Sequence, residues 1–244
     1  MSIKEDAMFL RLGYIYRNHE EMIREAVESG MSIQEFLEDA LARECGQRRE
    51  NGQKKRIQQA RFPYRKYIID FKSGHLTPEL ASRIDRLKTL EFIDKNENVI
   101  LVGNPGTGKT HLAIALGIEV CMKGKTVLFA SVPNLVIELK EAMTLNQLTN
   151  YKRKFKNYDL VILDELGYIS FDKEENELLF NLLSSRNATG AVMITTNLTF
   201  DRWEEVFKDP VLTAAMVDRL AHKAHVLDMT GDSYRIKETR EWML

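Results

Sequence analysis

A short stretch near the middle of the chain constrains the fold more than any other. An apolar run, residues 98–102, leads into the loop GNPGTGKT, which begins at Gly103 and ends at Thr110. The loop fits the pattern G-x-x-x-x-G-K-[ST], in which backbone N–H groups wrap phosphates and glycines leave room for them. In this pattern Lys109 reaches the β- and γ-phosphates, and the hydroxyl of Thr110 ligates Mg²⁺. We therefore predict a nucleotide site formed by Gly103, Asn104, Pro105, Gly106, Thr107, Gly108, Lys109, Thr110 and His111.

The alternative interpretation is a glycine-rich turn that matches the pattern by chance. The surroundings argue against it, because residues 99–102 have the composition of a buried strand and residues 111–120 that of an apolar-rich helix. A helix that starts at the loop would also direct its positive end at the phosphates. We therefore favour the nucleotide site.

Strand-like and helix-like segments alternate through the rest of the chain. Strands are expected at 99–102, 126–130, 159–163, 191–196 and 224–229, and helices at 78–94, 109–122, 133–143, 200–207 and 211–221. A further helix is expected between Asp172 and Gly190. A polar stretch is expected between the helix at 133–143 and Tyr158. Strands that alternate with helices predict a parallel sheet covered on both faces, with ligands bound beyond the carboxyl ends of its strands.

Polar residues that suit phosphoryl transfer follow two of these strands. Asp164 could hold Mg²⁺ together with Thr110, and Glu165 could orient the attacking water. Asn197 could hold the water or the γ-phosphate from the neighbouring strand. Asp-Glu pairs and asparagines are also common at strand ends without any catalytic role. Because these residues occur together with the phosphate-binding loop, we favour a catalytic role. The candidate catalytic residues are Lys109, Glu165, Asn197 and Arg219. Of these, Arg219 would act on the nucleotide of a neighbouring subunit.

Two arginines have open interpretations. Arg219 could instead pair within its own chain with Asp218 or Asp228. Arg235 could reach phosphate, but the sequence does not place it relative to the sheet.

The N-terminal part of the chain has no strand signal. We expect a helical domain at 1–62, a linker at 63–76 that begins at a proline, and the nucleotide-binding domain at 77–244. Gly30 is expected to end a helix at 20–28, and Ser32 with Glu35 forms a capping-box pattern that starts the next one.

Charge is segregated along the chain. The formal net charge is −1, but residues 48–72 contain nine basic and two acidic residues. Such a segment predicts a nucleic-acid contact, with the following basic residues as candidates: Arg48, Arg49, Lys54, Lys55, Arg56 and Arg61. A solvated basic helix without a nucleic-acid partner is the alternative.

Cysteine content and hydropathy argue against a disulfide-bonded protein and against a membrane-spanning protein. The two cysteines, Cys45 and Cys121, lie far apart in helix-like contexts, so we expect no disulfide and a reducing cytoplasm. No apolar run approaches the roughly 18 residues that span a bilayer, so we expect no membrane partner. His222 and His225 have no partners in the sequence that would complete a zinc site.

Four segments of the chain resemble one family. The loop GNPGTGKTHLAIALG, the segment LVILDELGYISFDKEE, the strand MITTNLTF and the stretch DPVLTAAMVDRLAHKAHVLDMTGDSYRIKE are similar to transposition helper ATPases of the IstB type. These are AAA+ proteins related to the DnaC helicase loaders. The resemblance spans roughly residues 32–238 and includes the basic segment at 35–63.

The resemblance implies a fold and a set of roles. The fold would be α/β, a P-loop AAA+ three-layer sandwich with a mostly parallel five-stranded sheet, preceded by a small helical N-terminal domain. Lys109 and Thr110 would be Walker A residues, and Asp164 and Glu165 the Walker B pair. Asn197 would be sensor 1 and Arg219 a finger that acts in trans. The fifteen residues after Met229 are too few for the usual C-terminal lid, which leaves Arg235 as a weak substitute for sensor 2.

The resemblance also implies a function. Proteins of this type form ATP-dependent oligomers on duplex DNA, deform it and present it as a target to a partner transposase, with ATP and Mg²⁺ as cofactors. A DnaC-like helicase loader is the alternative, and a stand-alone NTPase without a nucleic-acid role is a third. A loader needs an exposed apolar docking surface in residues 1–61, where we expect few apolar residues beyond Phe36, Leu37 and Leu41.

Overall fold

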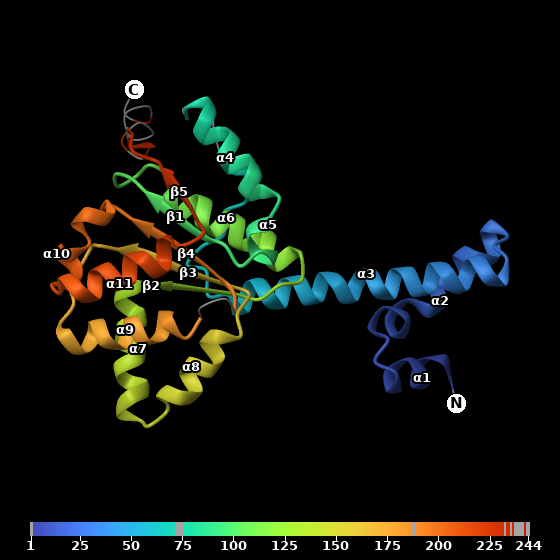
Figure 1. Ribbon diagram of the computed structural model, residues 1–244. Coiled ribbons are helices and arrows are strands. Elements are labelled where there is room, and N and C mark those ends of the chain that lie inside the picture. Colours follow the sequence, from blue (N-terminus) through green and yellow to red (C-terminus); the bar gives the residue numbers. More distant parts are fainter. Residues whose placement is uncertain are drawn as a thin grey trace. The chain divides into compact units, whose positions relative to one another are not determined.

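The computed structural model describes residues 2–71, 76–186, 189–231, 233, 234, 236 and 242. The chain forms two compact units, Met1–Lys55 and Arg56–Leu244, and Figure 1 shows the helices and strands of each. We call them the helical unit and the α/β unit. The division lies before the boundary at residue 62 that the sequence predicts, so the domain limits at 62 and 76 stay predictions.

The residues just after the division belong with the α/β unit for a physical reason. Ala60 is fully buried, and its carbonyl accepts a hydrogen bond from the N–H of Phe129 at 2.8 Å. The ring of Phe62 lies 6.0 Å from that of Phe129, between centroids. The apolar side chains in this segment therefore pack on the sheet.

In the helical unit, polar contacts link the ends of the helices. It contains the helices α1 Ile3–Phe9, α2 Gly13–Ser29 and the first part of α3 Ile33–Gln59. The buried carboxylate of Glu44 accepts hydrogen bonds from the N–H groups of Gly13, Tyr14 and Ile15, at 3.1, 2.7 and 3.3 Å. A carboxylate at this position accepts hydrogen bonds from the free N–H groups of the first turn. Its negative charge also interacts favourably with the positive end of the helix dipole.

The local helix signals in this unit are confirmed. Gly30 ends α2 in the left-handed conformation with φ of 67°. Ser32 and Glu35 exchange the two hydrogen bonds of a capping box at the start of α3. Helix α2 begins well before residue 20, because the cap at its start comes from Glu44, which lies about thirty residues away in the sequence.

The helical unit exposes more apolar surface than the sequence led us to expect. Phe9 is 86% exposed and Ile33 is 88% exposed. Other large apolar side chains on this surface are Ile3, Met8, Leu10, Ile23, Val27, Met31, Leu37 and Leu41. The expectation of few apolar residues was wrong, and a unit this small has too little interior to bury all of the apolar side chains on its helices.

The α/β unit is built on a five-stranded parallel sheet with the order β2-β3-β4-β1-β5. This confirms the predicted sheet. Its strands are β1 Asn98–Val102, β2 Val127–Ser131, β3 Leu160–Leu166, β4 Ala191–Thr196 and β5 Ala224–Asp228. Its helical elements after α3 are η1 Ile68–Asp70, α4 Pro78–Lys88, α5 Glu91–Asp94, α6 Lys109–Met122, α7 Val132–Thr144, α8 Leu148–Lys156, α9 Lys173–Ser184, η2 Phe200–Arg202, α10 Glu204–Phe207 and α11 Pro210–Ala221.

Both faces of the sheet are covered, which confirms the three-layer arrangement (Figure 1). Alternate residues of a strand point to opposite faces, so Ile100 and Val102 pack with residues of α7, α9 and α11. Val99 and Leu101 pack on the other face with residues of α4, α5 and α6. The predicted inward-facing leucines of α9 are buried: Leu178, Leu179, Leu182 and Leu183.

Helix α8 lies where the sequence suggested only a polar stretch. It buries a single large apolar residue, Phe155, so its sequence shows no apolar period. The buried guanidinium of Arg186 donates to the carbonyl oxygens of Phe155, Tyr158 and Ala191 at 2.6, 2.8 and 3.1 Å. Burial lowers the pKa of Arg186 to about 10. A contact from a distant residue therefore fixes the end of this helix.

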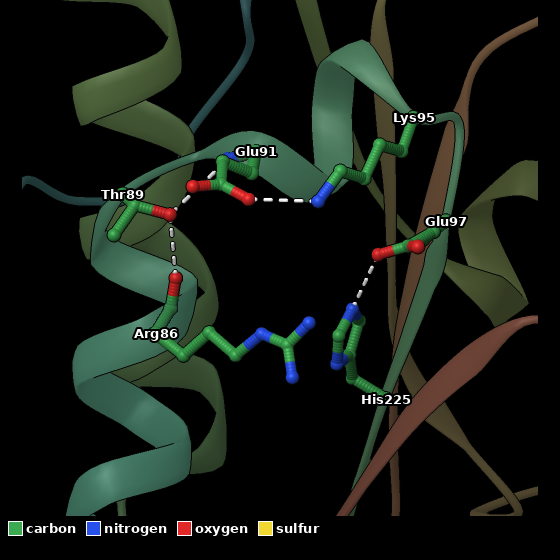
Figure 2. Close-up of polar contacts among 6 residues, drawn as sticks. All are labelled: Arg86, Thr89, Glu91, Lys95, Glu97 and His225. Atoms are coloured by element: carbon green, nitrogen blue, oxygen red, sulfur yellow. Dashed lines mark hydrogen bonds and ion pairs between the residues drawn. The ribbon is translucent and has the colours of Figure 1, made fainter.

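The expected single helix at 78–94 is divided into α4 and α5. Leu90 adopts the left-handed conformation with φ of 64°, which interrupts the helix while its side chain stays buried. Figure 2 shows the polar contacts beyond this break, where Lys95 meets Glu91 at 2.7 Å and Nε2 of His225 in β5 meets Glu97 at 2.7 Å.

The described residues contain no helix with the length and hydropathy that a membrane-spanning segment requires.

Candidate nucleotide-binding site

The glycine-rich loop joins the end of β1 to the start of α6, as the sequence predicts. Gly103 has a φ of 155°, and a Cβ at this position would lie 2.6 Å from the carbonyl carbon of Met229. Gly106 has a φ of 84°, and a Cβ there would collide with the side chain of Ser233. These two positions therefore require glycine for both conformation and space.

Lys109 lies in the first turn of α6 with its ammonium group curled over the loop. Its Nζ donates hydrogen bonds to the carbonyl oxygens of Gly103 and Asn104, at 2.6 and 2.7 Å. The residue is 6% exposed. The loop therefore holds the positive charge at the place where phosphate groups would enter.

Thr110 and Asp164 meet as the sequence predicts. The hydroxyl of Thr110 donates to Oδ1 of the buried Asp164 at 2.9 Å. The hydroxyl of Thr195 in β4 donates to the same oxygen, and the N–H of Glu165 donates to the Thr195 hydroxyl at 3.1 Å. Thr195 thus connects both acidic residues of the site. Its signal in the sequence was a hydroxyl close to the carboxyl end of an apolar strand.

Glu165 owes its position to a bulge that the sequence did not reveal. The pairing of β3 with β4 shifts register between Leu163, opposite Ile194, and Leu166, opposite Thr196. This inserts one extra residue into β3, and Glu165 takes the left-handed conformation with φ of 67°. Its side chain is exposed and lines the cavity described next. The bulge therefore places Glu165 at the same cavity as the phosphate-binding loop.

A cavity of about 420 Å³ lies over the loop and the start of α6. Its wall includes the loop, Glu165 and Thr195. It also includes residues that the sequence analysis assigned to the linker or to no role: Tyr64, Lys66, Asp70, Phe71, Tyr168 and Tyr234. The N–H of Tyr234 donates to the carbonyl oxygen of Gly106 at 2.9 Å. The segment before α4 therefore forms one side of the site.

His111 borders this cavity next to Thr110. Its ring stacks edge to face on Phe71, with centroids 5.5 Å apart, and its Nε2 has no hydrogen-bond partner among the described residues. Burial and the nearby ammonium of Lys66 lower the pKa of His111, against smaller opposing effects of the Tyr67 backbone and Asp70.

Asn197 follows β4 directly, at the predicted edge of the sheet. Its side-chain oxygen is buried and has no hydrogen-bond partner among the described residues. The backbone of Gly167 lies close, since a Cβ there would be 2.8 Å from that oxygen. Thr195, and not Asn197, supplies the β4 contribution to the cavity wall.

Arg219 lies on α11, outside the described cavity wall. Its guanidinium carbon is 5.3 Å from the ring centroid of Phe180 in α9. In the described part of the chain it forms no ion pair with Asp218 or Asp228, which was the alternative interpretation. Arg235 lies outside the described residues.

The basic candidates divide between the two units. In the helical unit, Arg48 donates to the carbonyl oxygen of Arg11 at 2.8 Å, and Lys54 lies 3.7 Å from Glu50. Arg49 and Lys55 are exposed, and no ion pair involves them among the described residues. These two side chains are the most available to an external anion.

In the α/β unit the two remaining basic candidates have internal partners. Arg56 donates from Nε to the carbonyl oxygen of Cys121 at 2.9 Å. Arg61 forms an ion pair with Glu138 at 2.9 Å and is exposed. Their charge is retained, but part of their hydrogen-bonding capacity is used within the protein.

Comparison with known proteins identifies relatives over nearly the whole chain. The family described as IstB-like ATP binding protein matches residues 6–242. The insertion sequence IS21 ATP-binding protein of Pseudomonas aeruginosa is 36% identical over 233 residues, which cover 95% of this chain and 88% of that protein. The insertion sequence IS5376 ATP-binding protein of Geobacillus stearothermophilus is 34% identical, over 90% of this chain and 87% of that protein.

Solved structures show the same fold at low sequence identity. The crystal structure of DnaI has a TM-score of 0.58 and 20% identity, covering 67% of this chain and 90% of that chain. AMPPCP-bound DnaA from Aquifex aeolicus has a TM-score of 0.57 and 17% identity, covering 72% of this chain and 53% of that chain. The α/β unit therefore has the AAA+ fold that the sequence predicted.

Proposed function

The chain belongs to the family of IstB-like ATP binding proteins, and on this premise we propose that it is an ATP-dependent, DNA-binding regulator of transposition. It hydrolyses ATP to ADP and phosphate with Mg²⁺, assembles into oligomers on duplex DNA, deforms the DNA and presents it to a partner transposase. The names of its relatives, which associate ATP binding with insertion sequences, support this proposal.

One observation carries the ATPase part of the proposal. The Thr110 hydroxyl and the Asp164 carboxylate meet at 2.9 Å beside the cavity that Lys109 and Glu165 line. Phosphoryl transfer requires positioning and positive charge more than covalent chemistry by the protein. A lysine, a hydroxyl and two carboxylates in this arrangement supply those requirements.

The residues present fit a magnesium ion. Mg²⁺ is commonly bound by one or two carboxylates, substrate phosphates and water. Oδ2 of Asp164 accepts no hydrogen bond from the described residues, so one carboxylate oxygen remains available beside the Thr110 hydroxyl. When bound, Mg²⁺ neutralises negative charge on the phosphates.

The protein groups around the phosphates have distinct roles in the proposed reaction. Lys109 holds the γ-phosphate, and Glu165 orients the attacking water and accepts its proton. Thr195 fixes both acidic residues, and Asn197 supports the water from the end of β4. Arg219 lies outside this cavity, so we assign it to the ATP site of a neighbouring copy, where it stabilises charge on the transferred phosphoryl group.

The basic residues make the proposed DNA contact. Exposed arginine and lysine side chains neutralise backbone phosphates and release counterions, which makes binding depend steeply on salt. Deforming duplex DNA costs on the order of several kcal/mol, which an oligomer with many phosphate contacts could offset. The contact residues are Arg48, Arg49, Lys54, Lys55, Arg56 and Arg61.

A Glu165→Gln variant tests the ATPase and the DNA function together. We expect ATP hydrolysis, measured as phosphate release, to fall about 10²- to 10³-fold, because the amide cannot accept the proton of the water. The variant should still retain ATP and DNA together in an oligomer, measured by size-exclusion chromatography with labelled DNA. Glu177→Gln, on the exposed face of α9, is the matched control. Retention of ATP without DNA would instead support a stand-alone NTPase.

One observation favours a helicase loader as a second candidate function. The helical unit exposes Phe9, Val27 and Ile33, which suit docking to another protein. A Phe9→Ser/Val27→Ser variant should lose capture of a replicative helicase and keep its affinity for duplex DNA if the chain is a loader. Unchanged handling of DNA and transposase in this variant, with no helicase bound by the wild type, would exclude the loader.

A further inference from the structure

The segment after β5 runs along the phosphate-binding loop. The backbone of Met229 lies against Gly103, since a Cβ at Gly103 would be 2.6 Å from the carbonyl carbon of Met229. Farther along the segment, the side chain of Ser233 lies against Gly106. The N–H of Tyr234 donates a hydrogen bond to the carbonyl oxygen of Gly106 at 2.9 Å. The segment therefore contacts the loop both at its first residue and near its middle.

Gly106 is not fixed by the phosphate-binding pattern, which specifies glycine only at the positions of Gly103 and Gly108. In the structure Gly106 has a φ of 84°, and a Cβ there would lie 3.0 Å from the Cβ of Ser233. Because Gly106 has no side chain, the segment after β5 can reach the backbone of the loop. The glycine therefore permits this contact as well as the turn of the loop.

The contact with Tyr234 fixes the direction of a peptide group in the loop. The peptide that joins Gly106 to Thr107 is planar and trans, so its C=O and N–H point in opposite directions. The N–H of Tyr234 holds the C=O, and the N–H of Thr107 is therefore directed away from the segment after β5. Both loop residues line the cavity. An N–H group that faces a phosphate attracts it, whereas a carbonyl oxygen in the same place repels it.

We propose that the segment after β5 is a clamp that holds the phosphate-binding loop in the conformation that receives the phosphates of a nucleotide. Tyr234 is the positioning residue, and it acts through the backbone of Gly106 and Thr107. The inference rests on the proposed ATP-binding function and adds a residue outside the glycine-rich pattern that sets the affinity for nucleotides. A loop that is held in its binding conformation beforehand loses less entropy on binding, so the clamp raises the affinity.

The hydrogen bonds within the loop do not perform this task. The hydroxyl of Thr107 donates to the carbonyl oxygen of Asn104 at 3.0 Å. Nζ of Lys109 donates to the carbonyl oxygens of Gly103 and Asn104. These three bonds hold the first half of the loop and do not involve the carbonyl of Gly106. The direction of that carbonyl therefore depends on the clamp.

The test separates the N–H of Tyr234 from its side chain. Tyr234→Pro removes both, whereas Tyr234→Ala removes only the side chain, so the difference between the two variants reports the N–H. The dissociation constant of ADP is measured by calorimetry on the full chain, and kcat and KM are measured for ATP. We expect Tyr234→Pro to bind ADP about tenfold more weakly than Tyr234→Ala, because the lost hydrogen bond frees the loop. The kcat values of the two variants should differ by less than about twofold, since the clamp acts on binding.

A second pair of variants keeps the N–H of Tyr234 and changes the fit of Ser233 to Gly106. Ser233→Val adds bulk at this close contact, which should lift the segment off the loop and weaken ADP binding about fivefold. Ser233→Ala is smaller and should bind ADP within about twofold of the wild type. This pair decides the outcome if Tyr234→Pro does not fold. Gly231→Ala is the control in the same segment, because a Cβ there would have no described atom within 4 Å, and it should leave the affinity unchanged.

The outcomes separate the clamp from the proposed function. Equal affinity for ADP in Tyr234→Pro and Tyr234→Ala would overturn the clamp, as would equal affinity in the two Ser233 variants. A lower kcat with unchanged affinity for ADP would also overturn it, because Tyr234 would then act in the chemical step. Failure of the wild type to bind ADP would instead contradict the proposed function itself.

Discussion

The two units of this chain differ in how much of their apolar surface they bury. In the α/β unit, every residue of α6 from Leu112 to Ile118 is buried. Among the described residues of the helical unit, only Ala7, Met22, Ala40 and Glu44 are buried. The α/β unit is therefore stabilised mainly by its core, whereas the helical unit depends on polar contacts at helix ends and leaves apolar side chains exposed.

This difference matches the chemistry assigned to each unit. The nucleotide site needs side chains held at fixed distances, and a packed sheet with helices on both faces provides that rigidity. The described residues of the cavity wall belong to the α/β unit, and the described residues of the helical unit include exposed apolar and basic side chains. These properties suit a unit that contacts partners.

The largest expected effect comes from a substitution that creates a cavity in the core of the α/β unit. Leu116→Ala in α6 should lower the free energy of unfolding by about 3 kcal/mol, because the residue is fully buried and its neighbours cannot close the space. Leu41→Ala, at a half-exposed position of the helical unit, is the matched control and should cost less than about 0.5 kcal/mol. Urea denaturation followed by circular dichroism measures both. Equal losses would show that the helical unit has a core of its own.

A smaller effect is expected from the cap of α2. Glu44→Gln should destabilise the helical unit by about 2 kcal/mol, because the charged acceptor of three N–H groups is lost. Hydrogen exchange of the α2 amides measures the change, and ATP hydrolysis without DNA should not change. Glu28→Gln, on the exposed surface of the same helix, is the control. A loss of ATPase activity in Glu44→Gln would mean that the two units are energetically coupled.

Thr195→Val tests positioning within the α/β unit. Its hydroxyl holds the side chain of Asp164 and the backbone of Glu165, so we expect the turnover rate of ATP hydrolysis to fall about tenfold. The affinity for ADP and the melting temperature should stay close to wild type. Thr144→Val, whose hydroxyl is exposed and bonds only the carbonyl of Lys140, is the control. A loss of ADP affinity equal to the loss of rate would indicate a binding role instead.

The smallest expected effect concerns the two cysteines, one of which lies in each unit. Cys45 in the helical unit is exposed and should react with a thiol reagent at once, whereas Cys121 in α6 should react only on unfolding. Burial raises the pKa of Cys121 to about 11 from 9.0. Its contribution to stability is therefore fully present below pH 9 and is lost as the pH rises to about 11.

A Cys121→Ala variant isolates this contribution. The free energy of unfolding is compared at pH 8 and pH 10.5, and the difference between the two pH values should be smaller in the variant than in the wild type. Rapid labelling of both thiols in the folded protein would mean that α6 opens more readily than its burial suggests.

The sequence determined the features that depend on local pattern. Gly103 and Lys109 lie in a loop between a strand and a helix, and the five strands alternate with helices as predicted. The meeting of Thr110 with Asp164 also followed, because parallel strands bring their carboxyl ends to one edge of the sheet. Gly30 and the capping box of α3 were found because each involves residues at most four positions apart.

Only the tertiary structure decided the features that join distant segments. The bulge that places Glu165 at the cavity results from the register of β3 with β4, and Thr195 contacts Asp164 and Glu165 across the same pairing. Tyr64 and Phe71 became cavity residues because the segment before α4 packs on α6. Periodicity and propensity predict the secondary structure of a segment, but they do not predict which distant side chains it contacts. The wall of this cavity is formed by side chains from segments that are distant in the sequence.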